Sequence, residues 1–207
     1  MESTRDAASF WDEQYRVPRP AQTSRANPVL AEIAGKLTPG TALDLGCGAG
    51  GDALWLAGRG WRVTAVDISA NAVRRLAENA QERGLHTAMS VVCVDLAEDF
   101  PEGSFDLVSA QYFHTPFALP RARVLRTAAH ALRPGGRLVI VDHGSAAPWS
   151  WSAQSHYPTP DEVFAELALD ARWRVERADM PRREATGPGG QTATVIDNVL
   201  VIRRTTA

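Results

Sequence analysis

The chain has 207 residues, of which 44% are hydrophobic and 22% are charged, and its formal net charge is −2 at pH 7. This length suits one domain with a substantial core, and the charge balance disfavours a partner bound through a phosphate backbone. The first residues carry acids without an apolar targeting segment, and no apolar run is long enough to span a bilayer. We therefore expect a cytoplasmic monomer or homodimer that binds neither a membrane nor nucleic acid.

Cysteine and histidine content argues against a metal centre. Cys47 and Cys93 are too few for a disulfide framework, a structural zinc site or an iron–sulfur cluster. No histidine pair has the helical i, i+4 spacing of metal ligands, and no cysteine or acid joins the histidines in a known pattern. We expect no metal, and we expect both cysteines to be small buried side chains.

Residues 1–36 predict two helices separated by a proline-rich break. Phe10, Trp11 and Tyr15 share one face of the first predicted helix, Ser9–Arg16, and Asn27-Pro28 is a favourable cap and first-turn pair for the second. The three aromatic side chains either dock the helix on the domain or form a lid over a ligand. The sequence leaves both possibilities open.

The segment 41–69 reads as a strand, a glycine turn, a helix, a strand and an acid. Thr41–Leu45 and Trp61–Val66 are apolar runs, and glycines at positions 46, 48, 50 and 51 follow the first of them. Glycine has no Cβ, so backbone N–H groups in this turn can approach a ligand closely. Asp67 ends the second strand, where an acid can accept hydrogen bonds from ribose hydroxyls. The segment therefore predicts a βαβ unit that binds a nucleoside derivative.

Two nucleoside cofactors compete for this unit. Gly46, Gly48 and Gly51 satisfy the dinucleotide pattern G-x-G-x-x-G, which would indicate an NAD(P)-dependent oxidoreductase. Asp44, two residues before the first glycine, instead suits a cationic ligand and is unfavourable beside a pyrophosphate. The turn also follows a helical preamble, and a third acid, Asp95, ends the next predicted strand, where it can meet an adenine amine. These features favour S-adenosylmethionine.

The remaining segments predict a doubly wound α/β sheet. A helix is expected over Ser69–Ala80 and another from Pro120 to Leu132, then a turn at Arg133–Gly136, and a further helix starts at Thr159. Residues 143–160 form a long aromatic loop of the kind that often covers a site. Together the apolar runs predict a single Rossmann-like sheet of seven strands, mostly parallel with a C-terminal antiparallel hairpin: Thr41–Leu45, Trp61–Val66, Met89–Val94, Ser104–Gln111, Arg137–Asp142, Trp173–Ala178 and Thr192–Arg203.

The order of these motifs resembles the class I S-adenosylmethionine-dependent methyltransferases. Asp44-Leu45-Gly46-Cys47-Gly48-Ala49-Gly50 is followed by Asp67, Asp95 and a Leu-Arg-Pro-Gly-Gly turn, and the opening Phe-Trp-Asp-x-x-Tyr-Arg resembles small bacterial methyltransferases of the tellurite-resistance and thiopurine types. The resemblance implies one methyltransferase domain over residues 1–207, with residues 1–36 as a helical lid segment. It also implies that S-adenosylmethionine is converted to S-adenosylhomocysteine. The residues implied for cofactor binding are Asp44, Gly46, Cys47, Gly48, Gly50, Asp67, Ile68, Asp95, Leu96 and Gln111.

The methyl acceptor is less constrained by the sequence. Gln111-Tyr112-Phe113-His114 stands where nucleic-acid and amine methyltransferases carry Asn/Asp-Pro-Pro-aromatic, so we expect a small molecule: a thiol, phenol, heterocyclic amine or metalloid anion. A thiolate needs no base, whereas a phenol or amine benefits from one, and an imidazole that titrates near neutral pH could supply it. Catalytic candidates are His114, Tyr112 and His143, and acceptor-binding candidates are Trp11, Tyr15, Tyr112, His114, Trp149 and Trp151.

Two alternatives to this function stay open. His114 could merely shape the pocket wall, and the fold could bind the cofactor without transferring a methyl group. An oxidoreductase is the second enzyme class, which cofactor titration distinguishes because only one of the two ligands should raise the melting temperature.

Overall fold

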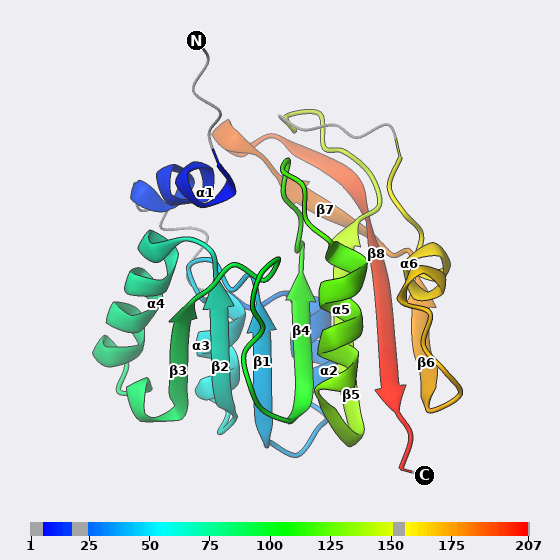
Figure 1. Cartoon of the computed structure of the whole chain (residues 1–207). Coiled ribbons are helices and arrows are strands. Elements are labelled where there is room, and N and C mark those ends of the chain that lie inside the picture. The colour runs from blue at the N-terminus through cyan, green and yellow to red at the C-terminus, as the bar shows by residue number, and fades with distance from the viewer. Residues whose placement is uncertain (1–5, 18–24, 151–155, 207) are drawn as a thin grey trace.

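The central feature is a sheet with the strand order β3-β2-β1-β4-β5-β8-β6, to which β7 is added by pairing with β8 (Figure 1). The computed structural model describes residues 6–17, 25–150 and 156–206. The strands in these ranges are β1 Thr41–Leu45, β2 Arg62–Asp67, β3 Met89–Cys93, β4 Phe105–Gln111, β5 Leu132–His143, β6 Trp173–Asp179, β7 Arg182–Thr186 and β8 Thr192–Arg204. The α-helices are α1 Ala7–Arg16, α2 Pro28–Ala34, α3 Gly51–Ala57, α4 Ala70–Glu82, α5 Arg121–His130 and α6 Pro160–Leu167.

Strand direction decides where a ligand can bind. β3, β2, β1, β4 and β5 pair in parallel, whereas β8 runs antiparallel to β5, β6 and β7. The carboxyl ends of the five parallel strands therefore meet at one edge, where an open α/β sheet usually carries its ligand site. α1 lies above this edge on one side, and β7 with the adjoining part of β8 rises above it on the other (Figure 1).

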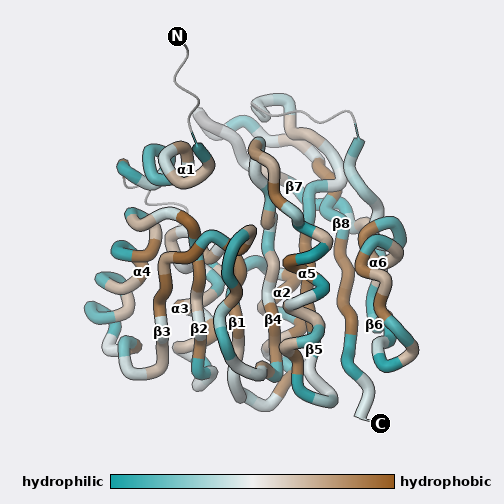
Figure 2. Tube along the Cα trace, in the orientation of Figure 1, coloured by the Kyte–Doolittle hydropathy of each residue, from teal (hydrophilic) through white to brown (hydrophobic). Residues whose placement is uncertain are grey.

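Helices cover both faces of the sheet. Buried side chains of α2, α3 and α4 pack on one face, and those of α5 and α6 pack on the other. Successive side chains of β1 point to opposite faces of the sheet. Ala42 packs with the buried residues of α2, α3 and α4, and Leu43 and Leu45 pack with those of α5 and α6. The hydropathy colouring shows mostly apolar central strands and helices in which polar and apolar residues are mixed (Figure 2). The predicted doubly wound α/β fold is confirmed.

Side-chain caps begin four of the helices in the described ranges, with Asp6 Oδ1 accepting a hydrogen bond from Ser9 N (2.7 Å) at the start of α1. Asn27 Oδ1 accepts a hydrogen bond from Val29 N (2.9 Å) at the start of α2, and Ser69 Oγ accepts one from Ala72 N (3.1 Å) at the start of α4. Both caps were expected from the sequence. Thr159 and Glu162 form a reciprocal capping box at α6. No helix within the described ranges is both long and apolar enough to cross a membrane.

The structure differs from the sequence-based expectation in three places. The sheet gains β7, whose sequence Arg-Arg-Glu-Ala-Thr has no apolar alternation because the strand is only partly buried. α5 ends at His130, two residues before the predicted end, and β5 already begins at Leu132, which pairs with Phe105 of β4. The predicted turn at Arg133–Gly136 therefore lies within β5, where the pairing with β4 shifts its register. Cys47 is buried as expected, but Cys93 is exposed because β3 is the edge strand of the sheet.

Candidate functional site

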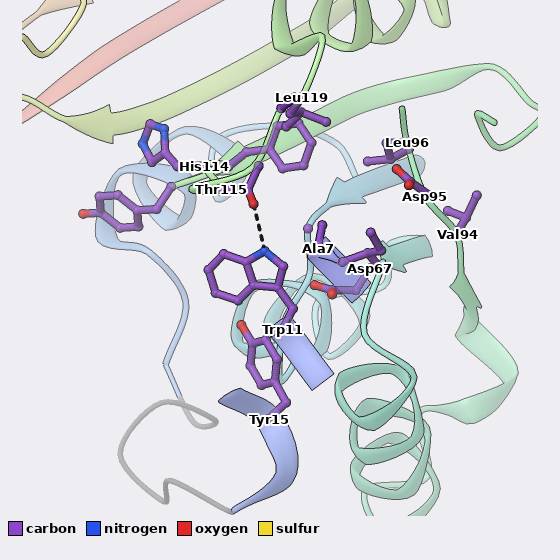
Figure 3. Close-up of a pocket in the computed structure, with 15 residues that line it drawn as sticks. Ala7, Trp11, Tyr15, Asp67, Val94, Asp95, Leu96, His114, Thr115 and Leu119 are labelled. Carbon is purple, nitrogen blue, oxygen red and sulfur yellow. Dashed lines mark hydrogen bonds between the residues drawn. The ribbon is translucent and has the colours of Figure 1, made fainter. Parts of the chain in front are cut away.

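A cleft of about 730 Å³, including its open mouth, lies at the carboxyl ends of the parallel strands (Figure 3). Its walls come from α1, the glycine turn after β1, and the segments that follow β2, β3 and β4. The lining residues are Ala7, Trp11, Tyr15, Gly46, Asp67, Ile68, Val94, Asp95, Leu96, Tyr112, Phe113, His114, Thr115, Ala118 and Leu119.

The floor of the cleft is the turn between β1 and α3. Gly46, Gly48 and Gly50 have φ angles of +63°, +51° and +88°, a backbone region that side chains other than glycine rarely adopt. A Cβ on Gly50 would lie 2.1 Å from Cδ1 of Leu76, which is fully buried in α4. The turn is therefore closed by close packing against α4 as well as by backbone conformation.

Asp67 fixes this turn to the end of β2. Its Oδ2 accepts a hydrogen bond from Gly48 N (2.8 Å) and its Oδ1 accepts one from Ser69 N (2.9 Å). The side chain is only 7% exposed, and burial raises the pKa of the carboxyl although the amide donors act to lower it. The carboxylate still lines the cleft, and its oxygens can accept further hydrogen bonds there (Figure 3).

The segment after β3 forms the next wall. Asp95 is exposed at the cleft rim, and its Oδ1 accepts a hydrogen bond from Ala97 N (2.8 Å). Leu96 is 9% exposed and packs against the core, with Ile68 and Val94 beside it in the cleft wall. This pocket of apolar side chains with one carboxylate suits a flat heterocycle that carries an amine.

Two carboxyl groups lie beneath the floor. Asp44 is 2% exposed, and its Oδ2 has no hydrogen-bond partner among the described residues. Burial, followed by the charge of Asp52, raises the pKa of Asp44 well above its usual value. Asp52 accepts a hydrogen bond from Asn27 N (2.6 Å), and burial raises its pKa to about 6. A bound cation would favour the ionised form of these two carboxyl groups, and a neutral or acidic ligand would not.

Helix α1 crosses the mouth of the cleft. Trp11 Nε1 donates a hydrogen bond to Thr115 Oγ1 (3.2 Å) on the far wall (Figure 3). Tyr15 lies over the glycine turn, its hydroxyl 2.5 Å from the position that a Gly48 Cβ would take. Asp12 accepts hydrogen bonds from Ser69 Oγ (2.7 Å) and Asn71 N (2.9 Å). None of the helix residues is buried, and α1 is held in place by polar contacts of this kind together with the edge contact of the Phe10 ring with Phe117 (centroid distance 5.3 Å).

The wall after β4 contains the aromatic and imidazole groups. The ring of Tyr112 stacks on His143 with a centroid distance of 4.4 Å, and His143 stacks on His114 at 5.7 Å. Arg121 Nη2 donates to both carboxylate oxygens of Asp142 (2.8 and 2.6 Å), and His114 Nε2 lies 3.4 Å from Asp142 Oδ1. Burial, and then the charges of Arg121 and His143, lower the pKa of His114 to about 3. The expectation that this imidazole titrates near neutral pH is therefore wrong.

The chain is similar in sequence to known methyltransferases. Residues 43–140 match a family described as a methyltransferase domain. The small subunit ribosomal RNA methyltransferase C of Chromohalobacter salexigens is 37% identical over 153 residues, which cover 68% of this chain and 41% of that protein. The 27-O-demethylrifamycin SV methyltransferase of Amycolatopsis mediterranei is 33% identical over 137 residues, covering 64% and 49%. The chain thus spans less than half the length of these curated relatives.

Solved structures resemble nearly the whole chain. One concerns the conversion of a disulfide bond into a thioacetal group during echinomycin biosynthesis; it has a TM-score of 0.74 and 26% identity, and covers 97% of this chain and 93% of its own. The magnesium protoporphyrin IX methyltransferase of Synechocystis with bound S-adenosylmethionine has the same fold, with a TM-score of 0.65, 17% identity and coverage of 99% and 100%. Residues 43–140 thus match a methyltransferase domain, and the chain as a whole has the fold of the class I S-adenosylmethionine-dependent methyltransferases.

Most residues that the sequence assigned to the methyltransferase cofactor gather around this cleft. Gly46, Asp67, Ile68, Asp95 and Leu96 line it directly. Gly48 and Gly50 belong to the turn that forms its floor, and Asp44 lies below that turn. Cys47 is buried in the core and does not line the cleft.

The side chain of Gln111 faces the sheet instead of the cleft. Its Nε2 donates to Ser109 Oγ (3.2 Å) and to Val139 O (3.3 Å). A cofactor contact from Gln111 would therefore need to come from its backbone.

The predicted acceptor residues divide into two groups. Trp11, Tyr15, Tyr112 and His114 line the cleft, while His143 supports Tyr112 from behind. Trp149 instead packs against Gly187 in the β7–β8 connection, and Trp151 lies outside the described residues. The structure adds Arg121, Asp142, Arg183 and Asp197, which hold the imidazole and phenol groups. Of these, Asp142 alone had a sequence signal, an acid near the end of a predicted strand.

Proposed function

We propose that this protein transfers the methyl group of S-adenosylmethionine to a small-molecule acceptor bound in the cleft. One observation carries the proposal: a single cleft runs from the acids Asp67 and Asp95 to the polar aromatic wall at Tyr112 and His114. Methyl transfer from a sulfonium is an in-line displacement, so a shared cleft that aligns donor and acceptor is the main requirement.

The cofactor half of the cleft comprises the glycine turn, Asp67, Ile68, Asp95 and Leu96. In our proposal Asp67 accepts hydrogen bonds from the ribose hydroxyls, and Asp95 with the Leu96 amide binds the adenine. The turn from Gly46 to Gly50 lies beneath the methionine moiety. The unpartnered oxygen of Asp44 is available to the methionine ammonium, directly or through water, and a cation there would favour its ionised form.

The acceptor half comprises Trp11, Tyr15, Tyr112, Phe113 and His114. We propose that α1 is the lid of this half, because its aromatic side chains close the mouth and its tryptophan bridges to Thr115. Lid closure would exclude water from the sulfonium and the nucleophile. Residues 1–36 would then be the lid segment of one methyltransferase domain that extends over the whole chain.

The chemistry of the acceptor half favours a nucleophile that needs no protein base. His114 is neutral at physiological pH but too weakly basic to hold a proton, and the Tyr112 phenol, whose pKa burial raises to about 12, is already protonated. Neither group is therefore suited to take a proton from a phenol or amine. A thiol ionises by itself and is a strong nucleophile as the thiolate. The similarity to a structure concerned with sulfur chemistry during echinomycin biosynthesis agrees with a sulfur acceptor. We therefore propose a thiol, with His114 shaping the wall as a neutral imidazole.

An RNA acceptor is the competing possibility, because one relative is named as a ribosomal RNA methyltransferase. The experiment is a transfer assay with radiolabelled S-adenosylmethionine and three sets of acceptors: thiols, phenols with heterocyclic amines, and purified small ribosomal subunits. Calorimetry with S-adenosylmethionine and NAD tests the cofactor separately. Label transfer to thiols supports the proposal, whereas transfer to RNA alone, or binding of NAD alone, would overturn it.

A further inference from the structure

Tyr112 has an unusual backbone conformation at the centre of the acceptor half. Its φ is +50°, and it is one of two residues other than glycine with a positive φ in the described part of the chain. Tyr112 N donates to Val141 O (2.7 Å) and its carbonyl accepts from His114 N (2.8 Å), so the chain turns sharply one residue after β4. A bulky residue in the left-handed region is strained, and its surroundings must hold it there.

The Tyr112 side chain is held by groups of β5, β7 and β8, and β7 is the strand absent from the sequence-based prediction. Arg183 Nη2 donates a hydrogen bond to the Tyr112 hydroxyl (3.1 Å), and Arg183 Nε donates to Asp197 Oδ2 (2.6 Å). The Tyr112 ring also stacks on His143, with an angle of 23° between the two rings. Tyr112 lines the cleft and His143 does not, so the ring stands between this support and the ligand space.

The guanidinium of Arg183 is already paired with the carboxylate of Asp197. Asp197 is 4% exposed, and a buried carboxylate requires a partner such as the guanidinium that contacts it. Arg121 is likewise paired with Asp142. Neither guanidinium is therefore available as a free cation for an anionic acceptor. Arg183 can instead act on the cleft through Tyr112, whose phenol it fixes in one orientation.

We propose that Arg183 is a positioning residue, which holds the Tyr112 ring as the acceptor wall and thereby selects acceptors with a flat, uncharged body. This inference rests on the proposed function, because the wall matters only if an acceptor binds beside it. The aromatic surroundings of Trp11 and Phe113 suit the same kind of acceptor.

A structural experiment tests the positioning without requiring turnover. Crystal structures would be determined for the wild-type protein, for the double variant Arg183→Gln/Asp197→Asn, which removes both charges together, and for Arg182→Gln. Arg182 is the exposed neighbour on the same strand and provides the control. We expect Tyr112 to leave its left-handed conformation, or its ring to leave His143, in the double variant alone. An unchanged Tyr112 in the double variant would overturn the proposal.

A kinetic experiment tests selection with two flat thiol probes, thiophenol and 4-mercaptobenzoate, of which only the second carries a charged group on its body. Arg183→Gln removes a hydrogen bond from a charged donor to Tyr112. We expect this variant to raise the KM for thiophenol about tenfold and to retain nearly all of kcat. Tyr112→Phe should act in the same direction, and combining it with Arg183→Gln should add little. Arg183→Lys should restore part of the loss, and calorimetry should give wild-type affinity for S-adenosylmethionine in every variant.

The outcomes separate this inference from the proposed function. A KM that changes no more in Arg183→Gln than in Arg182→Gln overturns the selection role, as does equal use of the two thiols by the wild type. If neither thiol is methylated, the proposed acceptor is wrong, and the crystal structures still decide whether Arg183 positions Tyr112.

Discussion

The two halves of the cleft are held together by different kinds of contact. In the cofactor half, Asp67 accepts from a backbone N–H that is 19 residues away along the chain. In the acceptor half, Tyr112 is held by a side-chain bond to Arg183, which is 71 residues away. Backbone geometry thus fixes one half and side chains from distant strands fix the other. The acceptor half can therefore change by substitution while the glycine turn and the sheet stay intact.

The largest effect should follow from a change in the backbone-determined half. Gly50→Ala combines a positive φ of +88° with a Cβ 2.1 Å from buried Leu76. Strain of about 1–2 kcal/mol and overpacking of about 1–3 kcal/mol predict a loss of roughly 2–5 kcal/mol in the free energy of unfolding. Gly84→Ala is the matched control, since its φ is +68° but its Cβ would meet open space. Denaturant unfolding measures both; equal losses would show that packing against Leu76 contributes nothing.

Removing the lid should damage turnover far more than stability. We expect deletion of residues 1–20 to lower the rate of methyl transfer by about 10²-fold, because alignment and exclusion of water are lost. The melting temperature should change little, since α1 contains no buried residue. Trp11→Phe keeps the ring and removes the bond to Thr115, so it separates packing from the bridge. Normal turnover of the truncated protein would reduce Phe10, Trp11 and Tyr15 to docking residues.

A smaller effect, on the affinity for S-adenosylmethionine, is expected when Asp67 at the end of β2 is replaced. Asp67→Ala removes acceptors for the ribose hydroxyls, whose charge-assisted bonds contribute about 1.5–3 kcal/mol each, so binding of S-adenosylmethionine should weaken at least about tenfold. Asp99→Ala, at an exposed acid outside the cleft, is the control. Calorimetry measures the two affinities. Equal affinity in both variants would remove Asp67 from the cofactor site.

The same contrast explains how far the sequence could be interpreted. That the glycine turn, Asp67 and Asp95 meet at one cleft could be predicted, because the glycines, the acids and the strands that carry them follow one another closely along the chain and each position has a local physical requirement. The acceptor half could not, because Arg183 lies in a polar strand without alternation and Asp197 in the middle of a long strand. Trp149 shows the converse: an aromatic in a long loop suggested a ligand contact, but the ring covers Gly187.

The smallest expected effect is that of His114 on the pH dependence of stability. It helps to decide whether His114 is a neutral part of the cleft wall or a general base. Its pKa is about 3 in the folded protein and 6.5 for the free side chain, so between these values the unfolded chain binds a proton that the folded chain does not. Acidification from pH 6.5 toward pH 3 should therefore destabilise the protein, by at most about 1.4 kcal/mol per pH unit. The side chain is 27% exposed, and solvent screening of the pKa shift narrows the pH range over which this slope applies.

His114→Gln should flatten the pH dependence of the free energy of unfolding over this window. His156→Gln, at an exposed histidine, controls for removal of an imidazole from the surface. Asp142 remains in both variants; burial raises its pKa, so its contribution has the opposite sign and is common to the comparison. With a thiol acceptor at pH 7, His114→Gln should retain most of the wild-type kcat, because a neutral wall residue transfers no proton. A large loss of kcat with unchanged affinity for S-adenosylmethionine would instead identify His114 as the base, and would require the bound acceptor to raise the pKa of the imidazole.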